Sequence, residues 1–387
     1  MSSIAIIGSG IAGLFSALKL ANEGHYVTII TKQRVKDSST NWAQGGIAGI
    51  LDKTDEKGKQ SHIEDTLRSG DGLCDEKVVR KVIDNAAECI FDLVNIGVKF
   101  EKSDTGKFKL AKEGGHSERR ILHAKDATGR EIERALSEAV ENHNNITLIK
   151  NTLAIDLIQR KYGIPDAGVC GVWCLNQKNS NVITIKADSV IIATGGVGQL
   201  WSKTTNPSVS TGDGVAMAWR FGAAVKDMAF IQFHPTALAV EGDRPFLITE
   251  ALRGEGGVIL DKQGVTQWEQ DCRNALNQNE ITPNPEKYSF TLNFSSLGSM
   301  ATRDIVARAI DNNLKLSGLS HVYLVTKHLE KKMLDNSFPN MQNHLNKYNL
   351  KLGIDHLPIS PAAHYIVGGL DVDIYGRPKL KHSNKSI

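Results

Sequence analysis

The stretch that most constrains the fold lies at the start of the chain, where two short apolar runs flank three glycines in G-x-G-x-x-G spacing. The apolar runs cover residues 4–7 and 27–30. After the glycines, apolar residues recur at helical intervals. This order predicts a strand, a tight turn, a helix and a second strand, which together open a dinucleotide-binding βαβ unit.

Each glycine of this motif has a separate physical task. Gly8 permits the tight turn, Gly10 lets the backbone approach a pyrophosphate, and Gly13 lets the helix pack closely on the strand. The N–H groups at the start of the helix then point at the phosphates. The alternative is a glycine turn with a structural role, but the strand–helix–strand context favours a bound dinucleotide. The residues expected to contact it are Gly8, Ser9, Gly10, Ile11, Ala12 and Gly13.

Composition narrows the class of protein. At 387 residues the chain is long enough for two or more domains, and 41% apolar with 23% charged residues is typical of a globular protein. The net charge is only +3 and the basic residues form no dense cluster, so we expect no nucleic-acid partner. Five scattered cysteines complete no metal-binding pattern and indicate reduced thiols in a cytoplasmic protein. No apolar run reaches the roughly eighteen residues of a membrane helix, so we expect no membrane association.

The residues after the second apolar run bear on which dinucleotide is bound. An NAD site usually carries an acidic residue at the end of the second strand. Here Lys32 stands near that place, which weighs against NAD. The next stretch, residues 37–49, is polar, rich in small residues and too glycine-dense for a helix. It is either a surface loop or, given the opening motif, a second loop that contacts the cofactor.

The sequence S-T-N-W-A-Q-G-G in this stretch resembles the flavin loop of FAD flavoproteins of the succinate dehydrogenase, fumarate reductase and L-aspartate oxidase group. The membrane-bound dehydrogenases of that group carry here a histidine bonded to the flavin, whereas this chain has Ser39. The resemblance therefore implies non-covalent FAD and favours the soluble L-aspartate oxidase branch. It implies FAD contacts from Lys32, Ser39, Thr40, Asn41, Trp42, Ala43, Gln44, Gly45, Gly46 and, at a later helix start, Asp213.

A charged loop at residues 113–120, E-G-G-H-S-E-R-R, resembles the corresponding loop of the L-aspartate oxidases. The resemblance implies that Glu113 faces the ammonium group of the substrate. A carboxylate suits this task, because an amino acid brings a positive charge that a plain dicarboxylate lacks. The alternative is a surface carboxylate, which is the usual state of a glutamate.

Three further motifs resemble the substrate-binding segments of the same family. They are Q-F-H-P-T at residues 232–236, L-I-T-E-A-L-R-G at residues 247–254, and P-A-A-H-Y at residues 361–365. The resemblance implies that His234 and Thr249 hold one substrate carboxylate, with Gln232 beside them, and that His364 donates to the other. Histidine and hydroxyl groups can donate hydrogen bonds to carboxylates, although a lone histidine is more often structural.

The candidate catalytic residue is Arg303, within T-R-D-I-V-A-R-A-I. Thr302 can cap the helix, so Arg303 falls in its first turn, where a cation opposes the helix dipole. The resemblance implies that this arginine exchanges a proton with the substrate. Free arginine is a poor base because its pKa is above about 12. The alternative is an arginine that pairs with Asp304 or with a neighbouring carboxylate.

The expected architecture is α/β. A Rossmann-like FAD-binding domain would comprise residues 1–228 and a return segment at residues 353–387, with an α+β capping domain inserted at residues 229–352. The resemblance implies oxidation of L-aspartate to iminoaspartate, with O2 or fumarate as the electron acceptor. This is the first step of quinolinate and NAD biosynthesis, and quinolinate synthase would be the downstream partner.

The resemblance extends to about residue 376, and residues 379–387 resemble nothing in the family. We therefore expect the C-terminal helical domain of the family to be absent. Two alternatives follow: a soluble fumarate reductase-like enzyme, against which Glu113 argues, and an inactive truncated remnant of the oxidase. The polar, Asn/Gln-rich residues 261–300 receive no function, and part of them is expected to be disordered.

Two local predictions complete the sequence analysis. Residues 75–97 are expected to form an amphipathic helix that Asp75 begins and Gly97 ends, with an apolar stripe that includes Val78, Val82 and Ile90. Residues 146–158, 169–175 and 182–185 are expected to form a β-meander.

Overall fold

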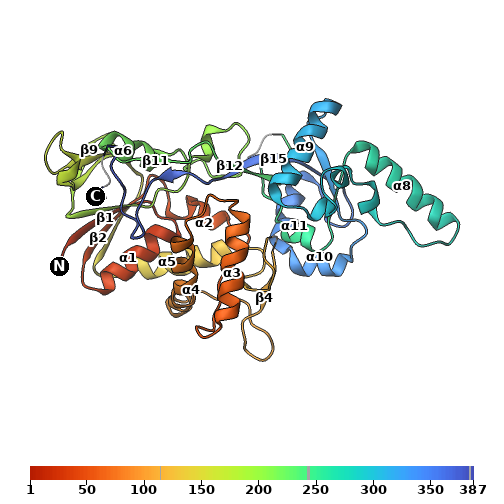
Figure 1. Ribbon diagram of the computed structural model, residues 1–387, viewed down its shortest axis with the longest axis horizontal. Coiled ribbons are helices and arrows are strands. Elements are labelled where there is room, and N and C mark those ends of the chain that lie inside the picture. The colour runs from red at the N-terminus through yellow and green to blue at the C-terminus, as the bar shows by residue number, and fades with distance from the viewer. Residues whose placement is uncertain (114, 242–244, 383–384) are drawn as a thin grey trace.

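A computed structural model describes residues 1–113, 115–241, 245–382 and 385–387 of the chain. These residues form two lobes along the long axis of the molecule (Figure 1). One lobe contains both chain termini, and the other contains the helices α8 to α11.

The first lobe is built on a parallel sheet of four strands in the order β10-β1-β2-β6. The strands are β1 (Ser3–Ile7), β2 (Tyr26–Ile30), β6 (Ile146–Ile149) and β10 (Ser189–Ile192). The apolar runs of the opening motif are β1 and β2, and helix α1 (Ile11–Asn22) connects them, as predicted. The apolar side chains of β1 are buried on both faces of the sheet, because other elements pack on each face.

The predicted meander is wrong only for residues 146–149 of its first segment. Residues 146–149 form β6, which pairs in parallel with β2 in the central sheet. The meander itself consists of β7 (Thr152–Gln159), β8 (Val169–Asn176) and β9 (Val182–Lys186). A four-residue apolar run carries no information about which edge it will join, so the sequence could not separate these strands.

Helices and the meander cover opposite faces of the central sheet. Helices α1, α4 (Glu76–Ile96) and α5 (Thr128–Glu141) pack on one face around Leu14, Ile90 and Leu136. On the other face β7, β8 and helix α6 (Asp213–Phe221) pack against the sheet. The smaller elements of this lobe are α2 (Ser39–Trp42), α3 (Glu56–Ser69), β3 (Ile47–Ala48), β4 (Leu110–Ala111), β5 (Ile121–Leu122), β11 (Val225–Lys226) and β16 (Gly369–Leu370).

Helix α4 confirms the predicted amphipathic helix and its ends. The Asp75 carboxylate accepts a hydrogen bond from the Lys77 N–H group at 2.9 Å, and Gly97 ends the helix with φ of +112°. The predicted apolar stripe is wrong at its start, because Val78 and Val82 are 39% and 63% exposed. Their end of the helix extends beyond the core that buries Ile90.

The second lobe contains an antiparallel sheet in the order β12-β15-β14-β13. Its strands are β12 (Ile231–Leu238), β13 (Val258–Leu260), β14 (Val322–Val325) and β15 (Leu357–Ile366). Its helices are α7 (Ala251–Gly254), α8 (Lys262–Asn277), α9 (Arg303–Ser317), α10 (Lys331–Ser337) and α11 (Pro339–Leu345). Strands β12 and β15 run as a ribbon between the two lobes (Figure 1).

Residues 261–300 are ordered, so the prediction of disorder is wrong. They contain α8 and the 3-10 turns Pro285–Tyr288, Phe290–Asn293 and Gly298–Met300. The Asp261 carboxylate caps α8 by accepting from the Gly264 N–H group at 2.7 Å, and the Trp268 indole donates to the Pro283 carbonyl at 2.9 Å. The segment is polar because α8 projects away from the lobe and exposes most of its surface (Figure 1). Across the described parts of both lobes, we find no helix that combines the length and apolar character needed to cross a membrane.

Asp126 joins the two lobes. Its buried carboxylate accepts hydrogen bonds from the N–H groups of Asn340 and Met341, at 2.9 and 3.0 Å, and from the Asn340 side-chain amide at 2.6 Å. The backbone donors lie in the first turn of α11, where N–H groups have no partner within the helix. A residue of the first lobe therefore caps a helix of the second.

We predict that Asp126→Ala lowers the free energy of unfolding by about 1–3 kcal/mol, because it removes a helix cap and leaves buried donors unpaired. Urea titration of the purified variant measures the change. The control is Asp335→Ala, which breaks an exposed pair with Lys331 on α10 and should change stability by less than about 0.5 kcal/mol. Equal stability of the two variants would contradict the assigned role of Asp126.

Candidate active site

The turn after β1 has the geometry that the glycine motif predicts. Gly8 has φ of +116°, and a Cβ atom there would lie 2.1 Å from the Ala193 carbonyl oxygen. A Cβ atom on Gly13 would lie 2.1 Å from the Gly8 carbonyl oxygen. Neither position has room for a side chain, so glycine is needed both for the turn and for the approach of α1 to β1.

A cavity of about 920 Å³ opens at the carboxyl ends of β1 and β2. This edge is where parallel α/β sheets bind their ligands, and the volume is near the upper end of about 300–1,000 Å³ for small-molecule sites. The start of α1 directs N–H groups towards it, which suits a pyrophosphate. The predicted residues that line the cavity are Gly8, Ser9, Gly10, Ile11, Ala12, Lys32, Ser39, Thr40 and Asp213. The cavity therefore fits a large dinucleotide such as FAD.

Lys32 and Asp213 form an ion pair in the wall of this cavity. The Lys32 ammonium lies 2.5 Å from the Asp213 carboxylate and 2.5 Å from the Thr211 hydroxyl. Asp213 is the first residue of α6, so it also meets the positive end of that helix dipole. Lys32 at the end of β2 is thus paired with an acidic residue from a distant segment.

The predicted flavin loop contributes to a second cavity of about 490 Å³, which shares lining residues with the first. Trp42, Ala43 and Gln44 line the second cavity, and Ser39 lines both. Residues 39–42 form the short helix α2, although the glycine content argued against a helix. Gly13, Asn41, Gly45 and Gly46 line neither cavity; Gly46 instead packs against the Leu122 carbonyl, where a Cβ atom would approach to 2.2 Å.

Arg303 is the first residue of α9 and lies in a cluster of charged and polar side chains. Its Nε–H group donates to the Glu250 carboxylate at 2.5 Å, and its terminal N–H group donates to the Gln232 side-chain carbonyl at 3.0 Å. Asp304, the partner considered from sequence, pairs with Arg308 instead. The neighbouring carboxylate that Arg303 meets is therefore Glu250.

Glu250 is the residue that the sequence analysis missed. It directly follows Thr249, and its second carboxylate oxygen accepts from Arg253 at 3.0 Å. Two features of the sequence pointed to Glu250: it lies within the motif at residues 247–254, and it precedes Arg253 by three residues. Neither signal could indicate Arg303, which lies 53 residues further along the chain.

Glu113 lies beside the same cluster. Burial raises the pKa of its carboxyl, the Arg303 cation opposes this rise, and the Glu250 carboxylate adds to it. The Gly46 N–H group donates to the Glu113 carboxylate. The loop of the first lobe thus brings a partly buried carboxylate to the arginine of the second.

His234 and His364 face each other on the β12–β15 ribbon, with ring centres 5.2 Å apart. Burial and the Arg303 cation hold the pKa of His234 well below its usual value and lower the pKa of His364 to about 4. Both rings are therefore neutral at pH 7. The Thr236 N–H group donates to His234 Nδ1 at 3.3 Å, which leaves the proton on Nε2 as a hydrogen-bond donor.

The second cavity reaches this cluster through His364. This residue lines the cavity and its Nδ1 atom lies 2.7 Å from the Thr205 hydroxyl. Thr249 is buried, and its hydroxyl oxygen accepts from the Ala251 N–H group at 3.3 Å, so the hydroxyl proton remains available to donate. Gln44 of the flavin loop donates to the Leu247 carbonyl at 2.8 Å, which ties the loop to the segment that carries Thr249.

The arrangement surrounds one region with neutral hydrogen-bond donors, a guanidinium group and two carboxylates. This combination can bind a small polar anion and move a proton. Within the described residues, no group of three or more histidine, cysteine or carboxylate side chains could hold a metal ion.

Comparison with known proteins agrees with this geometry. The FAD binding domain family matches residues 3–387. The chain is 41% identical over 386 residues to the L-aspartate oxidase of Yersinia pestis and covers 68% of it, and 40% identical over 385 residues to the chloroplastic L-aspartate oxidase of Arabidopsis thaliana, of which it covers 55%. The alignments cover 98% and 97% of this chain, which thus spans roughly half to two thirds of these relatives.

Solved structures show the same fold. The FrdA chain of a variant E. coli quinol fumarate reductase superposes with a TM-score of 0.82 and 27% identity. The superposition covers 98% of this chain and 63% of that one. The expected α/β flavoprotein fold is confirmed.

Glu133 of α5 gives the flavin-loop region a pH-dependent contribution to stability. It is buried, one carboxyl oxygen accepts from the Ser38 hydroxyl at 3.0 Å, and the other has no partner among the described residues. Burial raises the pKa of Glu133 to about 7, against the opposing effect of the Ser38 and Ser137 hydroxyls. The folded state therefore holds this proton more tightly than the unfolded state does.

We predict that the Glu133 proton contributes to the free energy of unfolding in full below about pH 4.5. This contribution is lost as pH rises through about 7. Relative to Glu133→Gln, the free energy of unfolding of the unmodified chain should fall by roughly 2–3 kcal/mol between about pH 5 and pH 8. Chemical denaturation at several pH values measures the difference. The control is Glu131→Gln, since Arg134 lowers the pKa of Glu131 and its titration falls outside this window. A difference independent of pH would contradict the prediction.

Proposed function

The chain belongs to the FAD-binding flavoprotein family that includes the L-aspartate oxidases, and from this membership we propose that it oxidises L-aspartate to iminoaspartate. The observation that carries the proposal is that Glu113 and two neutral histidines each lie within electrostatic range of Arg303, which pairs with Glu250. FAD, when bound, supplies the acceptor for the hydride removed from the substrate Cα. We assign FAD binding to residues 1–228 and 353–387, and capping of the site to residues 229–352.

Substrate binding follows from the charges of the cluster. His234, Thr249 and Gln232 would hold one carboxylate of L-aspartate, and His364 would donate to the other. Neutral histidines suit this task because they donate hydrogen bonds without requiring a buried positive charge. Glu113 would pair with the ammonium group, the feature that distinguishes L-aspartate from succinate.

Proton transfer would involve Arg303 together with Glu250. Oxidation of the amine removes a proton as well as a hydride, and Arg303 would exchange that proton with the substrate. A guanidinium alone gives up its proton with difficulty, since its pKa is above about 12. Glu250, in contact at 2.5 Å, orients the group and offers a carboxylate to which a proton can pass.

We further propose that FAD is held without a covalent bond, because Ser39 cannot form the bond that a histidine makes at the matching place in the membrane-bound dehydrogenases. Ser39 lines both cavities, and its hydroxyl lies 3.4 Å from the Ser210 hydroxyl. Acid precipitation of the loaded protein should release all flavin to the supernatant. Flavin that stays with the precipitate would overturn this part of the proposal.

O2 or fumarate would accept the electrons, and the similarity to a fumarate reductase chain supports fumarate. Iminoaspartate would then be consumed by quinolinate synthase in NAD biosynthesis. The competing functions are a fumarate reductase-like enzyme and an inactive remnant. Glu113 favours the oxidase over the reductase, because fumarate carries no ammonium group for it to meet.

The test of the proposed function is an anaerobic visible spectrum of the purified chain before and after addition of L-aspartate. Bound flavin that loses its visible absorbance on addition of L-aspartate would support the oxidase. Bleaching by succinate in preference to L-aspartate would favour the reductase-like enzyme. Flavin that fails to bind, or binds and is never bleached, would favour the remnant.

We predict that Arg303→Leu slows bleaching by L-aspartate about 10²- to 10⁴-fold, the usual loss when a group that transfers a proton is removed. Glu250 would still pair with Arg253, so the site should keep its other contacts. Anaerobic stopped-flow absorbance measures the rate. The control is Arg308→Leu on the same helix, whose guanidinium is exposed and pairs with Asp304; its rate should remain within about twofold. A full rate in Arg303→Leu would remove the proton-transfer role.

A further inference from the structure

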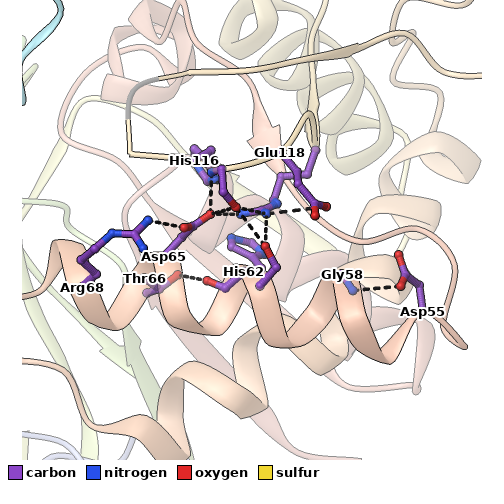
Figure 2. A network of polar contacts seen from close by, with 11 residues as sticks. Asp55, Gly58, His62, Asp65, Thr66, Arg68, His116 and Glu118 are labelled. Atoms are coloured by element: carbon purple, nitrogen blue, oxygen red, sulfur yellow. Dashed lines mark hydrogen bonds and ion pairs between the residues drawn. The ribbon is translucent and has the colours of Figure 1, made fainter. Parts of the chain in front are cut away.

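A buried ion pair lies behind the loop that carries Glu113. Arg120 and Asp65 are 1% and 3% exposed, and the Arg120 guanidinium donates to the Asp65 carboxylate at 2.7 Å. Figure 2 shows Asp65, His62 and Arg68 on α3 facing His116 and Glu118 of the loop. Arginine and aspartate are almost never fully buried unless they are paired, so this pair has a structural or functional reason.

Asp65 binds the loop as well as the arginine. Its carboxylate accepts from the Ser117 N–H group at 2.7 Å and from the Ser117 hydroxyl at 2.8 Å, and Arg68 donates to its other oxygen. Burial alone would raise the pKa of Asp65, but these donors and Arg120 hold it well below its usual value. The carboxylate is therefore charged at neutral pH and holds the loop through charge-assisted hydrogen bonds.

Arg120 links the loop to α3 at further points. It donates to the Ser61 hydroxyl at 3.0 Å and lies 3.3 Å from His116 Nδ1. Burial and the Arg120 cation lower the pKa of His116, so its neutral ring can accept this hydrogen bond. The His116 ring also packs on His62 of α3, with ring centres 5.6 Å apart.

The contacts continue from this cluster to Glu113. The His116 N–H group donates to the Glu113 carbonyl at 3.2 Å, and the Arg120 N–H group donates to the Ala111 carbonyl at 3.2 Å. Strands β4 and β5 pair antiparallel on either side of the loop, and β5 pairs with β3, which directly follows Gly46. The loop is therefore fixed at one end to α3 and at the other to the end of the flavin loop, with the Glu113 carboxylate against Gly46.

We propose that Asp65 and Arg120 are positioning residues that hold the Glu113 carboxylate where an ammonium group must bind. They would thereby determine the preference for an amino acid over a plain dicarboxylate. This inference rests on the proposed function, in which Glu113 meets the ammonium group of L-aspartate. Neither residue need contact the substrate, since both act through the loop.

The test compares how tightly the flavin-loaded protein binds L-aspartate and succinate. The apparent affinity for L-aspartate is measured without oxygen and at low temperature. The affinity for succinate is measured by titration of the flavin absorbance. Asp65→Asn should weaken apparent L-aspartate binding about tenfold or more and change succinate binding less than about twofold. The control is Asp55→Asn, which alters the N-terminal cap of the same helix and should leave both affinities unchanged. Equal losses for both ligands would indicate a merely structural role and overturn the proposal.

A double-variant cycle tests whether Asp65 acts through Glu113. Glu113→Gln should reproduce the loss for L-aspartate, and adding Asp65→Asn should cause little further loss. Additive losses would overturn the proposal. If Asp65→Asn fails to fold, Ser117→Ala replaces it, because it removes one hydrogen bond to Asp65 and leaves the ion pair; the loss should be smaller and equally selective.

Hydrogen exchange of the flavin-free protein separates this inference from the proposed function. Asp65→Asn should speed exchange of the Ser117 and Arg120 amides about tenfold or more, and Asp55→Asn should not. Exchange could be faster in Asp65→Asn although the unmodified protein shows no preference for L-aspartate. The loop would then be anchored as described, but the proposed function and the role of Glu113 in binding ammonium would be wrong. Unchanged exchange would overturn the anchoring itself.

Discussion

The structure depends on the close backbone approach at the end of β1. A side chain on Gly8 would collide with the Ala193 carbonyl, and one on Gly13 would collide with Gly8 itself. This contact sets the distance between β1, β10 and α1, and so it shapes the cavity at the carboxyl ends of the strands. The flavin loop then packs on the same turn, where the Thr40 hydroxyl accepts from the Ile11 N–H group at 2.9 Å.

The candidate active site is assembled from segments that are distant in sequence, and each alters the charge state of the others. Burial lowers the pKa of both histidines and raises that of Glu113, and the Arg303 cation adds to the first effect and opposes the second. Arg303 in turn is held by Glu250, which also pairs with Arg253. The same charges on a fully exposed surface would interact less, because water and salt would screen them. The Asp126 cap and the β12–β15 ribbon hold the two lobes together so that this burial is possible.

Much of the first lobe and the location of the candidate site could be predicted from the residues. The glycine spacing predicted β1, α1 and β2, and Asp75 with Gly97 predicted both ends of α4. The flavin-loop motif and the later motifs predicted residues that the fold brings around two adjoining cavities. The misses have physical reasons: β6 is too short to show which sheet it joins, and a polar segment such as residues 262–277 can form an exposed helix as readily as a loop. The roles of the individual site residues stay predictions.

The sequence by itself determined the local structure that depends on near neighbours: the glycine turn, the helix caps and the alternation of apolar residues. It also determined the family, because its motifs occur in family order. Only the tertiary structure decided the partners of the buried and partly buried charges. Arg303 meets Glu250 across 53 residues, and Arg120 meets Asp65 across 55. A buried charge is stabilised by whichever opposite charge the fold brings within a few ångströms, and that distance is set by packing and is independent of separation along the chain.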